Sequence, residues 1–97
     1  MINQGDVIKV MEHPYSDQTY FVGEVIATHA DSLVCLALSR VRSGRPVPLD
    51  SAHDKFATAR PDHDSMHDRY RARLGRPPRI QRLKQAVSEP VWRPGVA

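Results

Sequence analysis

A short run of acidic and histidine residues past the middle of the chain has the composition of a metal site. Residues 62–68 read Asp-His-Asp-Ser-Met-His-Asp, and on a helix His63 and His67 lie one turn apart on the same face. Imidazole and carboxylate groups are ligands for zinc and other divalent ions. No third ligand follows at a suitable spacing, and the same residues also suit the cap and acidic first turn of a helix. We therefore predict neither a metal site nor a cofactor.

The single cysteine is the other side chain that could carry chemistry. A nucleophilic thiol needs a partly exposed, electropositive setting that lowers its pKa. Cys35 instead lies inside the most apolar stretch of the chain, residues 33–38, which is typical of a packed thiol. The sequence also contains no phosphate-binding loop, dinucleotide-type glycine pattern or serine elbow. We predict that the protein is not an enzyme and has no catalytic residues.

Basic residues are concentrated in the last third of the chain. Residues 1–68 carry six Lys and Arg against ten Asp and Glu, whereas residues 69–97 carry eight against Glu89 alone. Arginine is the commoner base, and its planar guanidinium binds phosphate through two parallel hydrogen bonds. The basic segment suits contact with DNA or RNA, although it could equally pair with the acidic front of the chain. The candidate phosphate-contacting residues are Arg69, Arg71, Arg73, Arg76, Arg79, Arg82 and Lys84.

A second basic cluster and a set of apolar residues suggest protein contacts. Arg40, Arg42 and Arg45 lie close together in a segment that reads as a loop. A stripe with the i, i+4, i+8 spacing of one helical face either packs on the protein's own core or docks on a partner. A tryptophan framed by two prolines either inserts into a partner's groove or folds back. The candidate partner-binding residues are Met66, Tyr70, Leu74 and Trp92.

The front of the chain predicts β-strands. Runs rich in β-branched and aromatic residues alternate with turn residues, which is typical of short antiparallel strands. Gly23 interrupts the longest run and indicates a bulge or sharp bend. The predicted strands cover residues 7–11, 19–28 and 33–38, with weaker ones at 46–49 and 55–59.

The rear of the chain predicts helices. The apolar stripe begins after acidic residues that suit an N-cap, and Gly75 suits the C-cap. A second short helix is expected over residues 79–88, with Ile80, Leu83 and Val87 on one side. The organisation predicted from these patterns is a small β domain over residues 1–60 and a basic helical or extended tail over residues 61–97.

Three segments of the front half resemble one group of small barrels. Gly5-Asp6-Val7-Ile8-Lys9-Val10, then Phe21-Val22-Gly23-Glu24-Val25-Ile26, then Asp31-Ser32-Leu33-Val34, are similar to the strands of SH3-like domains of the KOW and Tudor groups. The resemblance covers residues 5–38 and implies a small antiparallel β-barrel. The expected fold class is therefore α+β, a small SH3-like barrel followed by one or two short C-terminal helices. Barrels of this kind bind many partners, so the resemblance leaves the function open.

Composition narrows the remaining function classes. The first residues lack the basic and apolar pattern of a signal peptide, so we expect none, and the longest apolar run is far shorter than the ~20 residues needed to cross a bilayer. We expect a cytoplasmic protein without a membrane partner. The main hypothesis is a non-enzymatic protein-interaction module, acting as an adaptor, an inhibitor or a homo-oligomer through its apolar stripe and basic tail. The alternative is an accessory protein that binds nucleic-acid phosphates without reading sequence.

Overall fold

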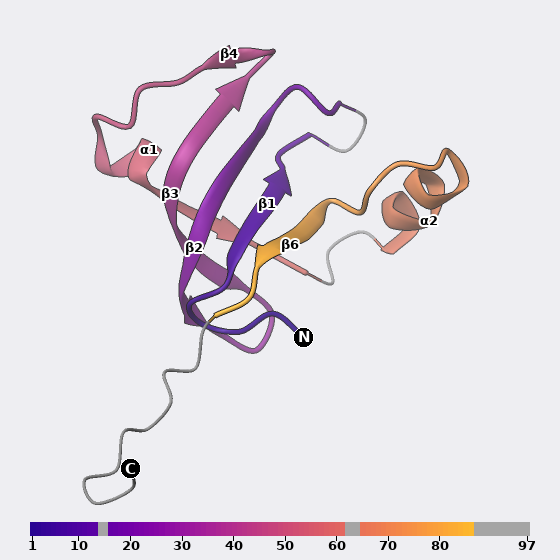
Figure 1. Ribbon diagram of the computed structural model, residues 1–97, viewed down its shortest axis with the longest axis horizontal. Coiled ribbons are helices and arrows are strands. Elements are labelled where there is room, and N and C mark those ends of the chain that lie inside the picture. Colours follow the sequence, from indigo (N-terminus) through magenta and orange to yellow (C-terminus); the bar gives the residue numbers. More distant parts are fainter. Residues whose placement is uncertain (14–15, 62–64, 87–97) are drawn as a thin grey trace, which may run out of the picture.

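The computed structural model describes residues 1–13, 16–61 and 65–86, with the side chains of 65–67 excepted. In this part of the chain six strands and two short helices form (Figure 1). No helix in it is both long enough and apolar enough to cross a bilayer. In chain order the elements are β1 (Val7–Met11), β2 (Tyr20–Thr28), β3 (Leu33–Arg42), β4 (Arg45–Pro46), α1 (Ala52–Lys55), β5 (Phe56–Ala59), α2 (Ser65–Arg73) and β6 (Ile80–Lys84).

All six strands belong to one antiparallel sheet. Its order is β4-β3-β2-β1-β6, and β5 also pairs with β3. β4 pairs with the end of β3, at Val41 and Arg42, whereas β5 pairs with its beginning, from Leu33 to Leu36. The predicted small antiparallel β-rich fold with short helices is confirmed. The described strands do not close into a barrel, because β5 and β6 are not paired with each other.

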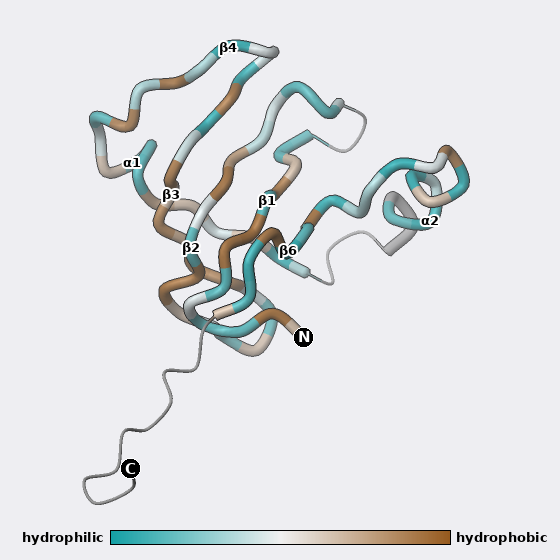
Figure 2. The backbone as a smooth tube through the Cα atoms, in the orientation of Figure 1, coloured by the Kyte–Doolittle hydropathy of each residue, from teal (hydrophilic) through white to brown (hydrophobic). Residues whose placement is uncertain are grey.

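The core lies inside the curl of the sheet. Alternate residues of the strands point inwards, as the period of two of a half-buried strand requires. Figure 2 shows the hydrophobic segments of β1, β2 and β3 side by side. Cys35 is fully buried, which confirms the prediction of a packed cysteine, and burial raises the pKa of its thiol to about 11. The buried cluster consists of Ile8, Val10, Phe21, Val25, Leu33, Cys35 and Ala59.

A bulge between β2 and β3 changes which side chains of β3 face inwards. Gly23 pairs with Ala37, but its neighbour Val22 pairs with Ser39, so Leu38 has no partner on β2. Before the bulge the buried residues of β3 are odd-numbered; after it the buried residue is Arg40. The irregularity predicted at Gly23 is confirmed, and it turns a charged side chain towards the interior.

Gly23 is expected to be intolerant of any side chain. A Cβ there would lie 3.0 Å from the Leu36 carbonyl oxygen, 3.2 Å from the Cys35 Cβ and 3.3 Å from the Phe21 ring. Because the neighbours are backbone and buried core, Gly23→Ala should lower the free energy of unfolding by about 1–2 kcal/mol. Urea denaturation measures the change, with Glu24→Ala on the exposed side of β2 as control, expected within about 0.5 kcal/mol of wild type. Equal urea midpoints for Gly23→Ala and wild type would contradict this packing.

The last third of the described chain agrees with the prediction in its first helix and differs in its second. The helix expected around the apolar stripe is present as α2, and Gly75 adopts a φ of +70° just after it. The second helix, expected over 79–88, is wrong: Ile80–Lys84 is strand β6, paired with β1. Ile80 and Leu83 fit a helical face by spacing, but β1 offers an unpaired edge whose backbone groups need partners. The sheet therefore includes residues on both sides of the boundary predicted at residue 60.

Asp6 fixes one end of the β1–β6 pair, where β1 begins and β6 ends. Its carboxylate is fully buried, and it accepts hydrogen bonds from the backbone N–H of Asn3 at 2.8 Å and of Ala86 at 2.6 Å. The guanidinium of Arg82, on β6, lies 3.7 Å away and also donates to the Met1 carbonyl. These contacts hold the described end of the chain beside its beginning.

Candidate binding site

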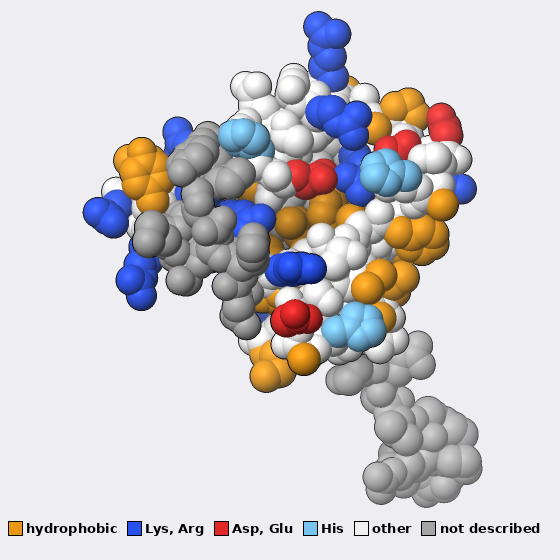
Figure 3. Space-filling view, turned by 180° about the vertical axis from the view of Figure 1, so that it is seen from behind, with side chains coloured by type: hydrophobic (Ala, Val, Ile, Leu, Met, Phe, Trp, Pro, Cys, Tyr) orange, Lys and Arg blue, Asp and Glu red, His pale blue; other side chains and the backbone are white. Residues whose placement is uncertain are grey.

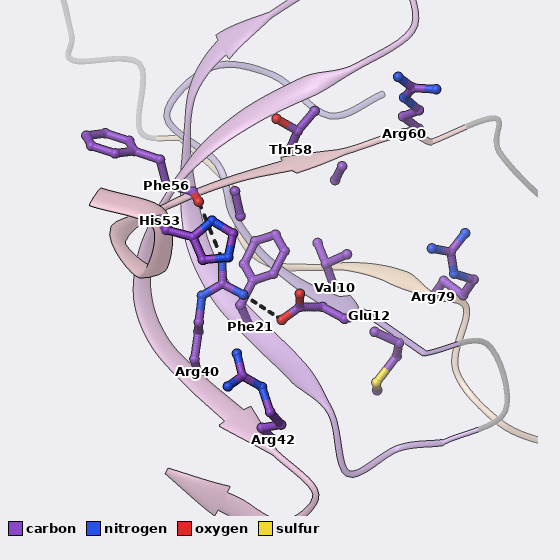
Figure 4. A pocket seen from close by; sticks show the side chains of 13 residues that line it. Val10, Glu12, Phe21, Arg40, Arg42, His53, Phe56, Thr58, Arg60 and Arg79 are labelled. Carbon is purple, nitrogen blue, oxygen red and sulfur yellow. Dashed lines mark hydrogen bonds and ion pairs between the residues drawn. The ribbon is translucent and has the colours of Figure 1, made fainter. Parts of the chain in front are cut away.

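A cavity of about 600 Å³ opens where the sheet fails to close. It lies between β5 on one side and the C-terminal end of β1 on the other, with the bulged part of β3 below them (Figure 4). Core residues Val10, Met11, Phe21 and Ala59 lie at its base, but more of its exposed lining is polar than apolar. Figure 3, seen from behind, shows a hollow with hydrophobic side chains in its depth and basic side chains around it. The cavity therefore has core side chains at its base and a polar, charged lining around them.

Arginines dominate the charge around this cavity. The charged lining residues are Arg40, Arg42, Arg60, Arg79 and Glu12, and His53 adds an imidazole. Among the described lining residues the one acid is Glu12, which already accepts a hydrogen bond from Arg40 Nη1 at 2.8 Å. The cavity thus keeps an excess of positive charge and favours an anionic ligand.

Arg40 is a buried part of the cavity wall. It is 9% exposed, and its Nε donates to the Asp54 carbonyl at 2.9 Å. Its Nη2 lies 3.4 Å from the Phe56 carbonyl oxygen, and its guanidinium carbon sits 5.3 Å from the centre of the Phe21 ring. One side chain thereby joins β3, the end of β1 and the α1–β5 connection.

Arg42 and Arg60 are the cations that a ligand could reach. Both side chains are exposed, and neither has an ion-pair partner among the residues that the structure describes. Arg42 follows Arg40 on the same face of β3, so the bulge aims both towards the cavity. In Figure 4 Arg60 projects from the far end of β5, on the other side from Arg42.

Arg79 occupies the wall next to β6 and is fixed through its backbone. Its N–H donates to the Asp68 carboxylate at 3.1 Å, and its carbonyl accepts from the Met11 N–H at 2.8 Å. Asp68 belonged to the acidic run that resembled a metal site. The residues that the structure describes contain no cluster of three or more metal-ligating side chains, and positions 62–64 and the His67 side chain lie outside that description.

Three of the predicted phosphate-contacting residues have guanidinium groups beside carboxylates of the same chain. Arg71 is 1% exposed and donates from Nη2 to Asp17 at 2.6 Å. Arg76 lies 3.9 Å from the same carboxylate, and Arg82 lies 3.7 Å from Asp6. The hydrogen bond from Arg71 is the main reason why the pKa of Asp17 is lowered. Of the other four, Arg69, Arg73 and Lys84 are exposed, and Arg79 lines the cavity.

The predicted partner-binding residues are only partly described. Tyr70 and Leu74 are about half exposed, at 48% and 51%, so α2 keeps part of its apolar stripe at the surface. The side chain of Met66 and the whole of Trp92 lie outside the described residues. Neither Tyr70 nor Leu74 lines the cavity between β1 and β5.

Sequence reasoning missed most of this site. It grouped Arg40 and Arg42 in a loop cluster, whereas both belong to β3, and it did not single out Glu12, His53 or Phe56. The available signal was the spacing of two arginines at i and i+2 after an apolar strand, which puts both on one face.

Comparisons with protein-family models, with curated proteins and with solved structures found no match for this chain. The interpretation of the cavity therefore rests on its own geometry and charge.

Proposed function

We propose that this protein is a non-enzymatic protein-interaction module that binds an acidic segment of a partner protein at the cavity between β1 and β5. The observation that supports it is the composition of the cavity: core side chains lie at its base, two exposed arginines, Arg42 and Arg60, line it, and Glu12, the one acid among its described lining residues, is already paired with Arg40. Apolar side chains of the partner would enter the cavity, and its carboxylates would meet the exposed guanidinium groups of Arg42 and Arg60.

The arrangement favours a protein partner over a nucleic acid. A phosphate-binding track needs a series of cations that remain available to the backbone of the ligand. In this chain Arg71 is buried against Asp17, and Arg76 and Arg82 lie beside carboxylates of the same chain. Of the basic segment, Arg69, Arg73 and Lys84 remain exposed, which is a shorter series of cations than the sequence predicted. The small cavity suits a few side chains better than a long polyanion.

Reversing the charge of Arg42 should weaken binding. A fluorescein-labelled peptide of alternating valine and glutamate serves as the probe, and fluorescence anisotropy measures its affinity. Arg42→Glu is expected to raise the Kd at least about tenfold, which corresponds to about 1.4 kcal/mol. Arg73→Glu is the matched control, because Arg73 is exposed on α2 and does not line the cavity. Its Kd should change less than about threefold.

Two outcomes would contradict the proposal. The first is equal affinity of wild type and Arg42→Glu for the acidic peptide. The second is binding of a single-stranded oligonucleotide that exceeds peptide binding and is lost in Arg73→Glu, which would transfer the function to the basic segment around α2. A peptide in which lysine replaces glutamate controls for non-specific apolar binding.

A further inference from the structure

We propose that the acidic segment binds as an extended strand, which adds to the outer edge of β5 and fills the opening of the sheet. This inference rests on the proposed function and specifies how the partner is held. Strand addition supplies affinity through main-chain hydrogen bonds and specificity through alternate side chains.

The outer edge of β5 carries no strand in the described part of the chain. β5 pairs with β3 along its whole length, from Leu36 opposite Phe56 to Leu33 opposite Ala59. On its other side lies the cavity, and all four residues of β5 contribute to the lining. An unpaired edge that opens onto a cavity presents backbone donors and acceptors to whatever enters it.

The hydrogen bonds of Phe56 show which backbone groups of β5 point away from β3. Its N–H donates to the Ala52 carbonyl, and its carbonyl oxygen accepts from Arg40 Nη2. Neither group therefore bonds to the backbone of β3, which puts Phe56 in a non-hydrogen-bonded position of the ladder. Positions alternate along an antiparallel pair, so the N–H and carbonyl of Thr58 also point to the outer edge.

Side-chain placement agrees with this register. Ala57 and Ala59 face the interior, whereas Phe56 and Thr58 are exposed. Figure 4 shows Thr58 and Arg60 projecting from the same side of the chain, away from the centre of the cavity. A strand added beside β5 would place alternate side chains over the apolar interior and the others beside Arg60.

The charges around the edge of β5 indicate which kind of peptide binds there. Arg42 and Arg60 flank the opening and are exposed, so a segment rich in glutamate or aspartate is complementary to it. A second copy of this chain would bring the same two cations against their counterparts, and like charges in close juxtaposition oppose pairing. The occupant is therefore an acidic extended peptide of another protein.

N-methylation of the probe peptide tests the strand directly. In an edge pairing only every second N–H of the peptide points to β5, so two variants of the valine–glutamate peptide are compared. One carries N-methyl groups on its glutamates and the other on its valines. We expect one of them to lose affinity at least about tenfold and the other to bind within about threefold of the unmethylated peptide. Equal affinities of the two variants, whether both retained or both lost, would overturn the strand model.

Proline at position 58 tests the same contact from the protein side. Because the N–H of Thr58 points away from β3, Thr58→Pro removes no ladder bond and should fold. It should bind the unmethylated peptide at least about tenfold more weakly, whereas Thr58→Val, which keeps the N–H, should bind like wild type. Unchanged affinity of a folded Thr58→Pro would overturn the inference; if that variant does not fold, the methylated peptides decide.

These results separate the two proposals. Dependence on Arg42 without any dependence on the position of the methyl groups would mean that side chains alone hold the peptide, so the proposed function would stand and the strand would not. No binding of the unmethylated peptide to wild type would remove the proposed function itself. A dimer that forms without peptide and is lost in Thr58→Pro would assign the edge to self-association and overturn the choice of occupant.

Discussion

Replacement of Arg71 by alanine is expected to lower the free energy of unfolding by about 2–3 kcal/mol. The side chain is buried, and it donates from Nη2 to Asp17 at 2.6 Å and from Nε to the Pro77 carbonyl at 2.7 Å. Removing it empties the space between α2 and the segment that follows α2, and leaves both acceptors without this donor. The loss is moderated because the Asp17 side chain is 46% exposed and can be solvated by water.

Matched variants separate charge from packing at this position. Arg71→Met fills most of the same volume without the hydrogen bonds and should recover part of the loss. Arg73→Ala, on the exposed side of the same helix, should stay within about 0.5 kcal/mol of wild type. Urea denaturation followed by circular dichroism measures all three variants. Equal stability of Arg71→Ala and Arg73→Ala would contradict a structural role for Arg71.

Substitution of Asp6 by asparagine is expected to destabilise the protein and to make its stability depend less on pH in the acidic range. Hydrogen bonds from the Asn3 N–H and then the Ala86 N–H, together with the positive charge of Arg82, lower the pKa of Asp6 below its ordinary value of 3.8, against the opposing effect of burial. An asparagine amide accepts with one oxygen only, so it would turn its own N–H₂ group towards one of these donors. At neutral pH the variant should therefore unfold at a lower temperature than wild type.

The pH dependence of this effect has a definite sign. Since the folded protein keeps Asp6 ionised where the unfolded chain begins to bind a proton, the stabilisation is complete well above pH 3.8 and is lost as the pH falls through the lowered folded-state pKa. The difference in stability between wild type and Asp6→Asn should shrink in that acidic window. Thermal unfolding measured at neutral and at acidic pH tests this, and a difference that stays constant with pH would count against it.

Local patterns predicted the strands that have apolar alternation and failed where a distant partner decides the conformation. The expected strand at residues 7–11 coincides with β1, and that at 19–28 differs from β2 by one residue. The third strand was predicted to end four residues too early, because Arg40 is polar. In the structure the buried guanidinium of Arg40 donates hydrogen bonds to Glu12 and to backbone carbonyls. Residues 79–88 were expected to be helical because a short apolar spacing fits both a helix and a strand, and only β1 decides between them.

The candidate site was harder to predict than the fold for the same reason. Its lining comes from five separate segments of the chain, so no spacing in the sequence joins Glu12, Arg40 and His53. The arginines of the tail were grouped because they lie close together in the sequence. Their number in that segment does not reveal that Arg71 is buried against the carboxylate of Asp17, 54 positions away. Contacts of this separation are set by the topology of the sheet, which local periodicity does not encode.

The pairing of the first strand with the last described one also has a consequence for how the protein forms during synthesis. Val7 lies opposite Lys84. One edge of β1 therefore stays unpaired until almost the whole described chain has left the ribosome. Contacts between residues so distant in sequence are slow to form, because a long stretch of chain must first lose its freedom. Until then the nascent sheet exposes an unpaired strand edge that can associate with other chains. The sheet is completed late, once the ribosome has released all of β6.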